Sequence, residues 1–355
     1  MRGRKLSRRN VLGASTVLAV GAVFPERLKS GVPEATAVNP AMIQAARKEG
    51  MIAFYTAMEI PIAEDLGKMF EAKYPGIAVH VKRSGAERVF QRIGKEEAIQ
   101  IYEVDVVCST DAAQFIHWKR DGLLAPYLPE EAAKHLPAEQ VDADAMYATA
   151  FALLSPIGYN TNIVKPDDAP KSFADLLDPR WNGKIVKGNP NYSGTIFTAT
   201  FQLARDLGWS YFERLAQQKV MQVQSALDPP MKLALGESAV QADGAKPNLL
   251  LLKEQRAPVE AVYATEGTPL ITAPSGVFTS APNPNAARLF QGFLFSIEVQ
   301  QFLVNASALC SFHALVKEKP GRRSLSAIKL MKSDPLAMEM QREEIKARYS
   351  RIFGV

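Results

Sequence analysis

Short apolar runs alternate with segments of helical hydrophobic spacing through the first third of the chain. Strand-like runs occupy residues 51–55, 77–81 and 104–108, and each is followed by a segment whose apolar positions recur every three or four residues. The last of these helical segments continues through Lys119. A β-α-β-α-β-α order of this kind predicts a mostly parallel sheet with helices on both faces.

The middle of the chain shows the same alternation and predicts a second unit of the same α/β class. The strands expected there are residues 157–160, 185–187 and 240–242, and the expected helices are 196–207 and 249–253. Two extended segments, 259–263 and 270–278, could carry the chain back to the first unit. Three helices are expected after that return, at 284–294, 297–305 and 335–352.

The first 37 residues have a different pattern, which is typical of a bacterial export signal. A basic start precedes an apolar run at 11–24, and small residues up to Ala37 offer a cleavage site. The pair Arg8-Arg9 before the apolar run resembles the twin-arginine signal. An ordinary export signal and a first transmembrane helix are the alternatives, although the run is shorter than the roughly 18 residues that span a bilayer. We therefore expect the chain after about Val38 to work in the periplasm.

The positive charge of the whole chain comes from this first segment. The chain carries 42 Lys and Arg against 37 Asp and Glu, a formal charge of +5. Residues 1–37 contain seven of the basic and two of the acidic residues, so the remainder has 35 of each. A nearly neutral protein lacks the basic stripe expected for nucleic-acid binding, and we predict no nucleic-acid partner. The remaining length of about 318 residues suits two domains.

Residues suited to catalysis or metal binding are few and scattered. The four histidines have no metal-ligand spacing, and no G-x-S-x-G, Walker or G-x-G-x-x-G motif is present. The two cysteines, Cys108 and Cys310, could pair in an oxidising compartment or remain as buried thiols. We predict no catalytic residue, no metal site and no cofactor. The histidines are His80, His117, His135 and His313.

Small polar turns follow several of the predicted strands and lead into helices. In open α/β sheets, ligands bind at the carboxyl ends of the strands. Helix N-termini there present free N–H groups and a positive dipole end, which suit a phosphate or a carboxylate. Each Ser, Thr or Asp could instead serve only as a helix cap. The turn residues that we select as ligand contacts are Thr56, Ala57, Ser84, Gly85, Ser109, Thr110, Ser193, Gly194, Thr195 and Asp243.

A few larger side chains near these turns are further candidates. Tyr159 and Tyr192 could line a cleft, and amphipathic packing is the alternative for both. Arg83 directly precedes the turn at Ser84 and could face an anionic ligand, or it could simply be solvated. Lys187 has the same two interpretations.

Several motifs resemble those of a known family. Tyr159-Asn160-Thr161, the stretch 170–184, and Tyr192-Ser193-Gly194-Thr195 occur in this order, followed by Glu266-Gly267-Thr268-Pro269 and the stretch 281–287. Pro75-Gly76 and the stretch 122–127 match the same pattern. Their order and spacing resemble extracellular solute-binding proteins of ABC importers, and most of all the branch described as ferric-iron-binding. The similarity covers essentially the whole chain after the export signal.

The resemblance implies a two-lobed periplasmic binding protein of type II, joined by two crossover strands. The first lobe would comprise residues 38–152 plus 272–355, and the second lobe residues 153–271. A small-molecule ligand would sit between the lobes, which close around it by hinge motion. The closed form would be offered to an ABC permease in the inner membrane, and we expect a monomer without enzymatic activity.

One departure from the family changes the expected ligand. Iron-binding members have a tyrosine pair after the strand that corresponds to residues 240–242, where this chain has Asp243-Gly244-Ala245-Lys246. Without those phenolates we expect a small organic or phosphorus-containing anion, with Asp243 accepting from a ligand ammonium or hydroxyl. The alternatives are ferric iron or an iron chelate, a periplasmic enzyme exported by the twin-arginine route, and a sensory binding module.

Overall fold

The computed structural model describes residues 34–355, which belong to one compact unit. The expected export signal, with its twin-arginine pair, lies almost entirely outside the described residues. Thr36, within the expected cleavage region, is described and pairs with the residues before α5 (Glu130–His135). Its amide donates to the Leu128 carbonyl at 2.8 Å, and its carbonyl accepts from the Glu130 amide at 3.1 Å.

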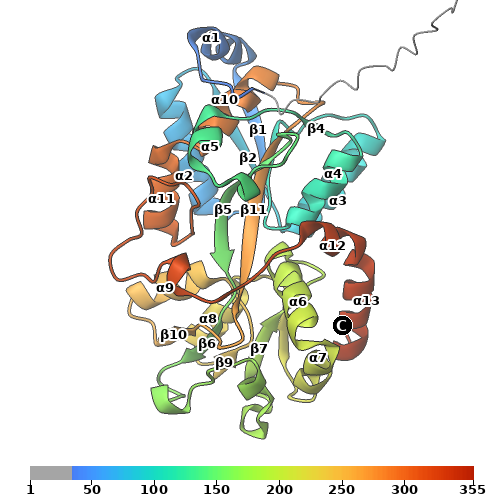
Figure 1. Cartoon of the computed structure of the whole chain (residues 1–355), viewed down its shortest axis with the longest axis vertical. Coiled ribbons are helices and arrows are strands. Elements are labelled where there is room, and N and C mark those ends of the chain that lie inside the picture. Colours follow the sequence, from blue (N-terminus) through green and yellow to red (C-terminus); the bar gives the residue numbers. More distant parts are fainter. Residues whose placement is uncertain (1–33) are drawn as a thin grey trace, which may run out of the picture. The chain divides into compact units, whose positions relative to one another are not determined.

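Seven strands form the first sheet, and we call the part of the chain built on it the first lobe (Figure 1). Its main order is β12–β11–β3–β1–β2, and β4 and β5 also pair with β11. The strands β1, β2 and β3 are parallel, whereas β11 runs antiparallel to β3 and to β5. The strands are β1 (Met51–Thr56), β2 (Ala78–Arg83), β3 (Val106–Cys108), β4 (Leu124–Ala125), β5 (Ala148–Leu154), β11 (Thr268–Phe278) and β12 (Leu330–Met331).

Five strands form the second sheet, on which the second lobe is built. Its order is β10–β6–β9–β7–β8, with β7, β8 and β9 parallel and β6 antiparallel to both of its neighbours. The two sheets share one arrangement. In the first sheet β1 lies between β2 and β3, and the antiparallel β11 borders β3; in the second sheet β7 lies between β8 and β9, and the antiparallel β6 borders β9. The strands are β6 (Ile157–Asn160), β7 (Ile185–Gly188), β8 (Met221–Val223), β9 (Val240–Gln241) and β10 (Val259–Val262).

The strands connect the two lobes at two crossovers, from β5 to β6 and from β10 to β11, and the chain passes to the second lobe once more near its C-terminus. This arrangement confirms the expected α/β class with two sheets flanked by helices. The helices associated with the first lobe are α1 (Pro40–Glu49), α2 (Ile60–Lys73), α3 (Ala86–Ala98), α4 (Ala112–Arg120), α5, α10 (Pro284–Leu294) and α11 (Ile297–Ser307). Those of the second lobe are α6 (Gly194–Leu207), α7 (Trp209–Ala216), α8 (Asp228–Ala234) and α9 (Lys246–Glu254).

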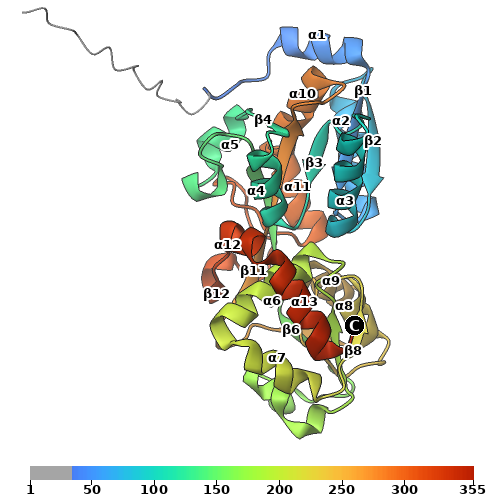
Figure 2. The same ribbon diagram turned by 90° about the vertical axis from the view of Figure 1, so that its right-hand side faces the viewer.

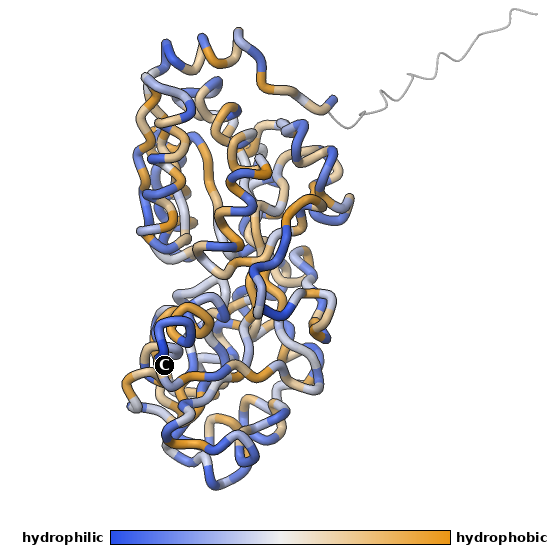
Figure 3. Tube along the Cα trace, turned by 90° about the vertical axis from the view of Figure 1, so that its left-hand side faces the viewer, coloured by the Kyte–Doolittle hydropathy of each residue, from blue (hydrophilic) through white to orange (hydrophobic). Residues whose placement is uncertain are grey.

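Burial on both faces explains why β1 reads as a continuous apolar run. Ile52 and Phe54 belong to one hydrophobic cluster, and Ala53 and Tyr55 belong to another, so alternate residues face opposite sides of the sheet. Strands covered by helices on both faces need apolar residues at every position. Most of the outer helices bury one side, and hydrophobic and hydrophilic positions alternate along them (Figure 3), whereas α6 and α10 are buried over most of their surface.

The C-terminal helices differ from the sequence-based expectation. One helix was expected over 335–352, but the structure has α12 (Pro335–Met340) and α13 (Arg342–Phe353). The first packs against α4 of the first lobe, and the second packs against α7 of the second lobe (Figure 2). Tyr349 lies in the hydrophobic cluster of the second lobe, so α13 departs from the expected boundary that placed residues 272–355 in the first lobe.

The two cysteines are buried and unpaired, which decides between the two interpretations of the sequence. Burial raises the pKa of both thiols, as expected for side chains that behave as small apolar groups. Among the helices of residues 34–355, none is both long and apolar enough to cross a bilayer.

Candidate functional site

A cavity of about 170 Å³ lies between the lobes, at the carboxyl ends of β1, β2, β3, β7, β8 and β9. Every turn that follows one of these strands contributes residues to its lining. The first lobe supplies Ala57, Met58 and Glu59 after β1, Gly85, Ala86 and Arg88 after β2, and Thr110 after β3. The second lobe supplies residues 192–195 after β7, residues 224–227 after β8, and Ala245, Pro247 and Asn248 after β9.

Helix N-termini point to an anionic ligand for this cavity. The six turns lead into α2, α3, α4, α6, α8 and α9. Gly85 and Ala245 are the N-cap residues of α3 and α9, and neither provides a side chain to satisfy the first free amides. Uncapped N–H groups and the positive ends of the helix dipoles favour negatively charged groups nearby.

The charged side chains of the lining favour the same ligand class. Arg83, Arg88 and Glu59 carry the charges among the lining residues, so the formal balance is positive. The Arg83 Nε donates to the Met58 carbonyl at 3.1 Å, which holds this side chain against the turn after β1. Both arginines are exposed and can therefore rearrange toward a ligand.

One part of the lining is apolar. It is formed by side chains from β5 and α2, by the residue that precedes α8 and by the segment after α11. A ligand with a carbon skeleton as well as a charged group would fit this combination of surfaces. The residues of this part are Ile62, Phe151, Leu153, Leu227 and Leu309.

Two glycines allow the lobes to approach each other at the edge of the cavity. A Cβ atom on Gly194 of α6 would lie 2.7 Å from the Asp111 Cβ and 2.9 Å from the Ala86 Cβ, both in the first lobe. A Cβ atom on Gly85 would lie 3.0 Å from the Tyr192 carbonyl oxygen. The turns of the two lobes are therefore in direct contact at this edge of the cavity.

Ion pairs from α13 connect the second lobe to the first beside this contact. The Arg342 Nη2 lies 2.7 Å from the Asp111 Oδ2, and its Nη1 lies 3.5 Å from a Glu87 oxygen. The Lys346 Nζ lies 2.8 Å from the same Glu87 oxygen. The Arg342 guanidinium also lies 4.6 Å from the ring centroid of Phe197 in α6. We call Arg342, Lys346, Glu87 and Asp111 the interlobe ion-pair group.

The structure brings many of the sequence-predicted residues to the cavity. They come from both lobes, as the hypothesis of facing turns requires. The Ser193 Oγ also accepts from the Ile196 amide at 3.4 Å, so this residue caps α6 as well as lining the cavity. Those that line the cavity are Ala57, Arg83, Gly85, Thr110, Tyr192, Ser193, Gly194 and Thr195.

Other predicted residues have different surroundings. The Thr56 Oγ1 accepts from the Met58 amide at 3.0 Å, and the Ser109 hydroxyl donates to the Gln114 Oε1 at 2.9 Å, so both side chains stabilise turns. Ser84 donates its amide to the Thr56 carbonyl at 3.1 Å and does not line the cavity. Tyr159 lines a separate hollow on the second lobe with Tyr263 and Arg323.

Asp243 also lies away from the cavity lining, in a buried ion pair. Its Oδ2 is 2.5 Å from the Lys187 Nζ, with side-chain exposures of 0% and 1%, and its Oδ1 accepts from the Gly188 amide at 2.9 Å. Burial raises the pKa of Asp243 and lowers that of Lys187, and the attraction between the two opposes both shifts. These two candidates for ligand contact therefore neutralise each other within the second lobe.

Several lining residues were not found from the sequence. Arg88 lies in the first turn of α3, five positions after Arg83, and this placement could have identified it. The turn at 224–227 was missed because β8 has only three residues and α8 begins with Asp228-Pro229-Pro230. Ser307 and Leu309 come from the end of α11, which no local pattern connects with the cavity.

Comparison with known proteins places the chain in a family. Residues 51–306 match the family model described as bacterial extracellular solute-binding protein. A relative described as a probable ABC transporter periplasmic-binding protein, y4fP of Sinorhizobium fredii, is 24% identical over 241 residues. That match covers 64% of this chain and 65% of the relative, slightly less than two thirds of its length.

Solved structures share the fold. The periplasmic binding protein AfuA from Actinobacillus pleuropneumoniae, with exogenous fructose-6-phosphate bound, has a TM-score of 0.79 and 23% identity, covering 86% of this chain and 99% of that one. Iron-bound HitA from Pseudomonas aeruginosa has a TM-score of 0.75 and 20% identity, covering 85% and 99%. The fold is that of the type II periplasmic binding proteins, and the chain belongs to the family of bacterial extracellular solute-binding proteins.

Proposed function

We propose that this chain is the substrate-binding component of an ABC transporter. It captures a small organic or phosphorus-containing anion in the interlobe cavity and delivers it to a permease in the inner membrane. The family membership and the similarity to y4fP support the transport role. In this proposal the chain acts in the periplasm as a monomer and does not transform its ligand.

The observation that carries the ligand class is the convergence of six strand-to-helix turns on one cavity. Arg83 and Arg88 add positive charge to the dipole ends of the helices. The apolar lining, including Phe151 and Leu153, favours an organic anion over a bare inorganic one.

Ferric iron fits this lining less well. Fe(III) favours hard oxygen donors, and the described lining offers one carboxylate, Glu59, and one phenol, Tyr192. A chelate that brings its own donors would need fewer protein ligands. For catalysis, the described lining contains no histidine, cysteine or aspartate, and its one carboxylate, Glu59, makes no hydrogen bond to a serine or threonine hydroxyl among the described residues.

The proposal is tested by thermal unfolding with a panel of anions, followed by calorimetric titration of those that stabilise the protein. The panel contains phosphate esters including fructose-6-phosphate, phosphonates, carboxylates, inorganic phosphate and ferric citrate. A ligand at 100 times its Kd should raise the free energy of unfolding by about 2.7 kcal/mol. Stabilisation by ferric citrate alone, or by no member of the panel, would contradict the proposed ligand class.

Variants then locate the binding. Ser193→Ala with Thr195→Ala should weaken binding of the stabilising anion by about 1–3 kcal/mol, because ligand oxygens lose their donors. Arg88→Met should also weaken it through the lost charge. Arg214→Met is the matched control, since Arg214 is an exposed arginine on α7 outside the lining. Equal affinities for all these proteins would exclude the cavity as the binding site.

A further inference from the structure

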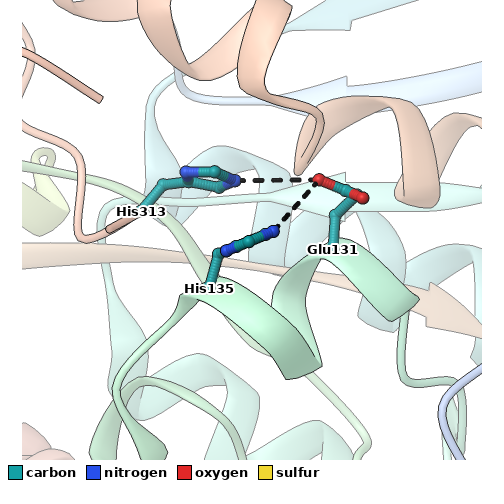
Figure 4. Close-up of side chains that lie close together, drawn as sticks. All are labelled: Glu131, His135 and His313. Carbon is teal, nitrogen blue, oxygen red and sulfur yellow. Dashed lines mark ion pairs between the residues drawn. The ribbon is translucent and has the colours of Figure 1, made fainter. Parts of the chain in front are cut away.

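A second group of polar side chains lies where α5 meets the segment after α11. Glu131 and His135 are four residues apart on α5, which places both on one face of the helix. His313 comes from a segment almost two hundred residues later in the chain. The Glu131 Oε2 lies 3.8 Å from the Nε2 atom of each histidine, and one ligand atom from each residue fits within 4.8 Å of the others (Figure 4).

His313 has an unusual environment for a polar side chain. The residue is only 3% exposed, and its Nε2 has no hydrogen-bond partner among the described residues. This nitrogen points toward Glu131, and the centroids of the two imidazole rings are 4.6 Å apart (Figure 4). A buried polar atom without a hydrogen-bond partner lowers the stability of the fold. The orientation of the His313 Nε2 toward two other potential metal ligands therefore needs an explanation.

We propose that Glu131, His135 and His313 bind a divalent transition-metal ion, with zinc as the best match. Two imidazole nitrogens and one carboxylate oxygen form a donor set that zinc accepts in tetrahedral geometry, leaving one position for water. Zinc–ligand distances of about 2.0–2.2 Å place the donors about 3.4 Å apart. The Glu131–histidine distances of 3.8 Å therefore need to shorten only slightly.

The proton positions give metal binding a distinct signature. The His313 Nδ1 accepts from the Leu315 amide at 3.3 Å, so the neutral ring without metal carries its proton on Nε2. A metal uses the Nε2 lone pair, and the proton must then reside on Nδ1. Two N–H groups cannot face each other, so the Leu315 amide turns away when the metal binds. This rearrangement lowers the affinity relative to a fully preformed site.

The proposed metal site would join α5 to the segment after α11, which also reaches the solute cavity, but it would not be part of that cavity. None of its three residues lines that cavity. The Ala314 amide donates to the His135 carbonyl at 2.9 Å, and Cys310 pairs with Ala152 of β5. Leu309, in the same segment, lines the cavity. A bound metal would therefore restrain the segment that carries this part of the lining.

The test is calorimetric titration of the full chain, without a polyhistidine tag, with zinc chloride near neutral pH. We expect one zinc ion per chain. Glu131→Gln should weaken binding at least about tenfold, since even residues behind metal ligands commonly contribute that much. Glu131 is partly exposed, so this variant should fold, which thermal unfolding verifies. His80→Gln removes an exposed histidine of β2 as a matched control and should bind zinc like the parent.

A second measurement separates this site from scattered surface binding. Zinc should shift the amide resonance of Leu315 in the parent and in His80→Gln at the same zinc concentration, and Glu131→Gln should need about ten times more zinc for the same shift. Absence of saturable binding with one ion per chain, or equal affinity of Glu131→Gln and the parent, would overturn the proposal. An unshifted Leu315 resonance in zinc-saturated protein would overturn it as well.

Discussion

The third parallel strand of each sheet is followed by a buried aspartate, and the two aspartates are neutralised in different ways. Asp111 follows β3 in the first lobe, and Asp243 follows β9 in the second. The cation for Asp243 is Lys187, at the end of β7 in the same lobe. The cation for Asp111 is Arg342, from a helix packed on the opposite lobe.

This difference separates stability within a lobe from contact between lobes. The Lys187–Asp243 pair is fully enclosed, and the Tyr349 ring centroid lies 4.8 Å from the Lys187 Nζ. It persists however the lobes are placed. The Arg342–Asp111 pair can exist only while the lobes are together. Opening the cavity would expose Asp111 to water and leave Arg342 without this partner.

Removing the enclosed cation should produce the largest effect. Lys187→Met leaves the Asp243 carboxylate buried and uncompensated, and we expect a loss of about 3–5 kcal/mol in the free energy of unfolding. Urea unfolding followed by circular dichroism measures this loss. Lys187→Met combined with Asp243→Leu should recover much of it, because an apolar pair leaves no buried charge. A loss below about 1 kcal/mol in the single variant would show that the pair is not enclosed.

Removing the interlobe cation should cost less. We expect Arg342→Met to lower the free energy of unfolding by about 1–3 kcal/mol, because Asp111 can regain water when the lobes separate. Small-angle scattering should also report a larger radius of gyration for the variant without ligand. Arg348→Met is the control on the same helix, since its partner Glu213 is 3.6 Å away and both are exposed. Identical scattering of Arg342→Met and the parent would contradict the role in closure.

The effect of Arg342→Met should depend on pH in a defined direction. Burial raises the pKa of Asp111, and Arg342 opposes that increase. While the lobes of the variant are closed, the Asp111 carboxyl stays buried and has a raised pKa. The stability contribution of Asp111 in this closed form is fully present below the unfolded pKa of about 3.9 and is lost as pH rises through the folded pKa, where opening of the lobes relieves the cost. The stability deficit of the variant should therefore grow between pH 4.5 and 7.5, measured by urea unfolding at several pH values. A deficit that shrinks with rising pH would contradict this assignment.

The smallest effect is expected for the second cation of the interlobe ion-pair group. Lys346→Met removes one contact to Glu87, which Arg342 still approaches at 3.5 Å. We expect a loss of about 0.5 kcal/mol in the free energy of unfolding. Combining it with Arg342→Met should cost more than the sum of the single changes, because Glu87 then has neither of these partners. Strict additivity in this double-mutant cycle would show that the two cations act independently.

The order of strands and turns could be predicted because it depends on local patterns. Strand β1 and helices such as α2 and α10 occur close to where hydrophobic spacing places them. Strand β5 was not expected because its sequence is rich in alanine, which is depleted in strands, and its complete burial leaves no alternation to offset that. Helix α13 was expected in the first lobe but packs on the second, since its apolar residues do not specify which core they complete.

Residues of the candidate site could be predicted only where they line the cavity from the turn directly after a recognisable strand. Ser193, Gly194 and Thr195 were found because their turn has both the strand and the helix signal. Asp243 has the same local signal, yet its surroundings depend on Lys187, which is 56 positions earlier in the sequence. Pairing across such distances is set by the fold and leaves no trace in local composition.

The absence of a side chain at Gly194 makes docking of the two halves sensitive to a single methyl group. Alanine there would press against the Asp111 backbone amide and its neighbours, 2.7–3.1 Å from the added carbon. Such a substitution would leave each lobe folded but prevent the two lobes from making this contact. Under the proposed transport role, it would provide a binding protein held in its open conformation, with which a permease's discrimination between loaded and empty forms can be measured.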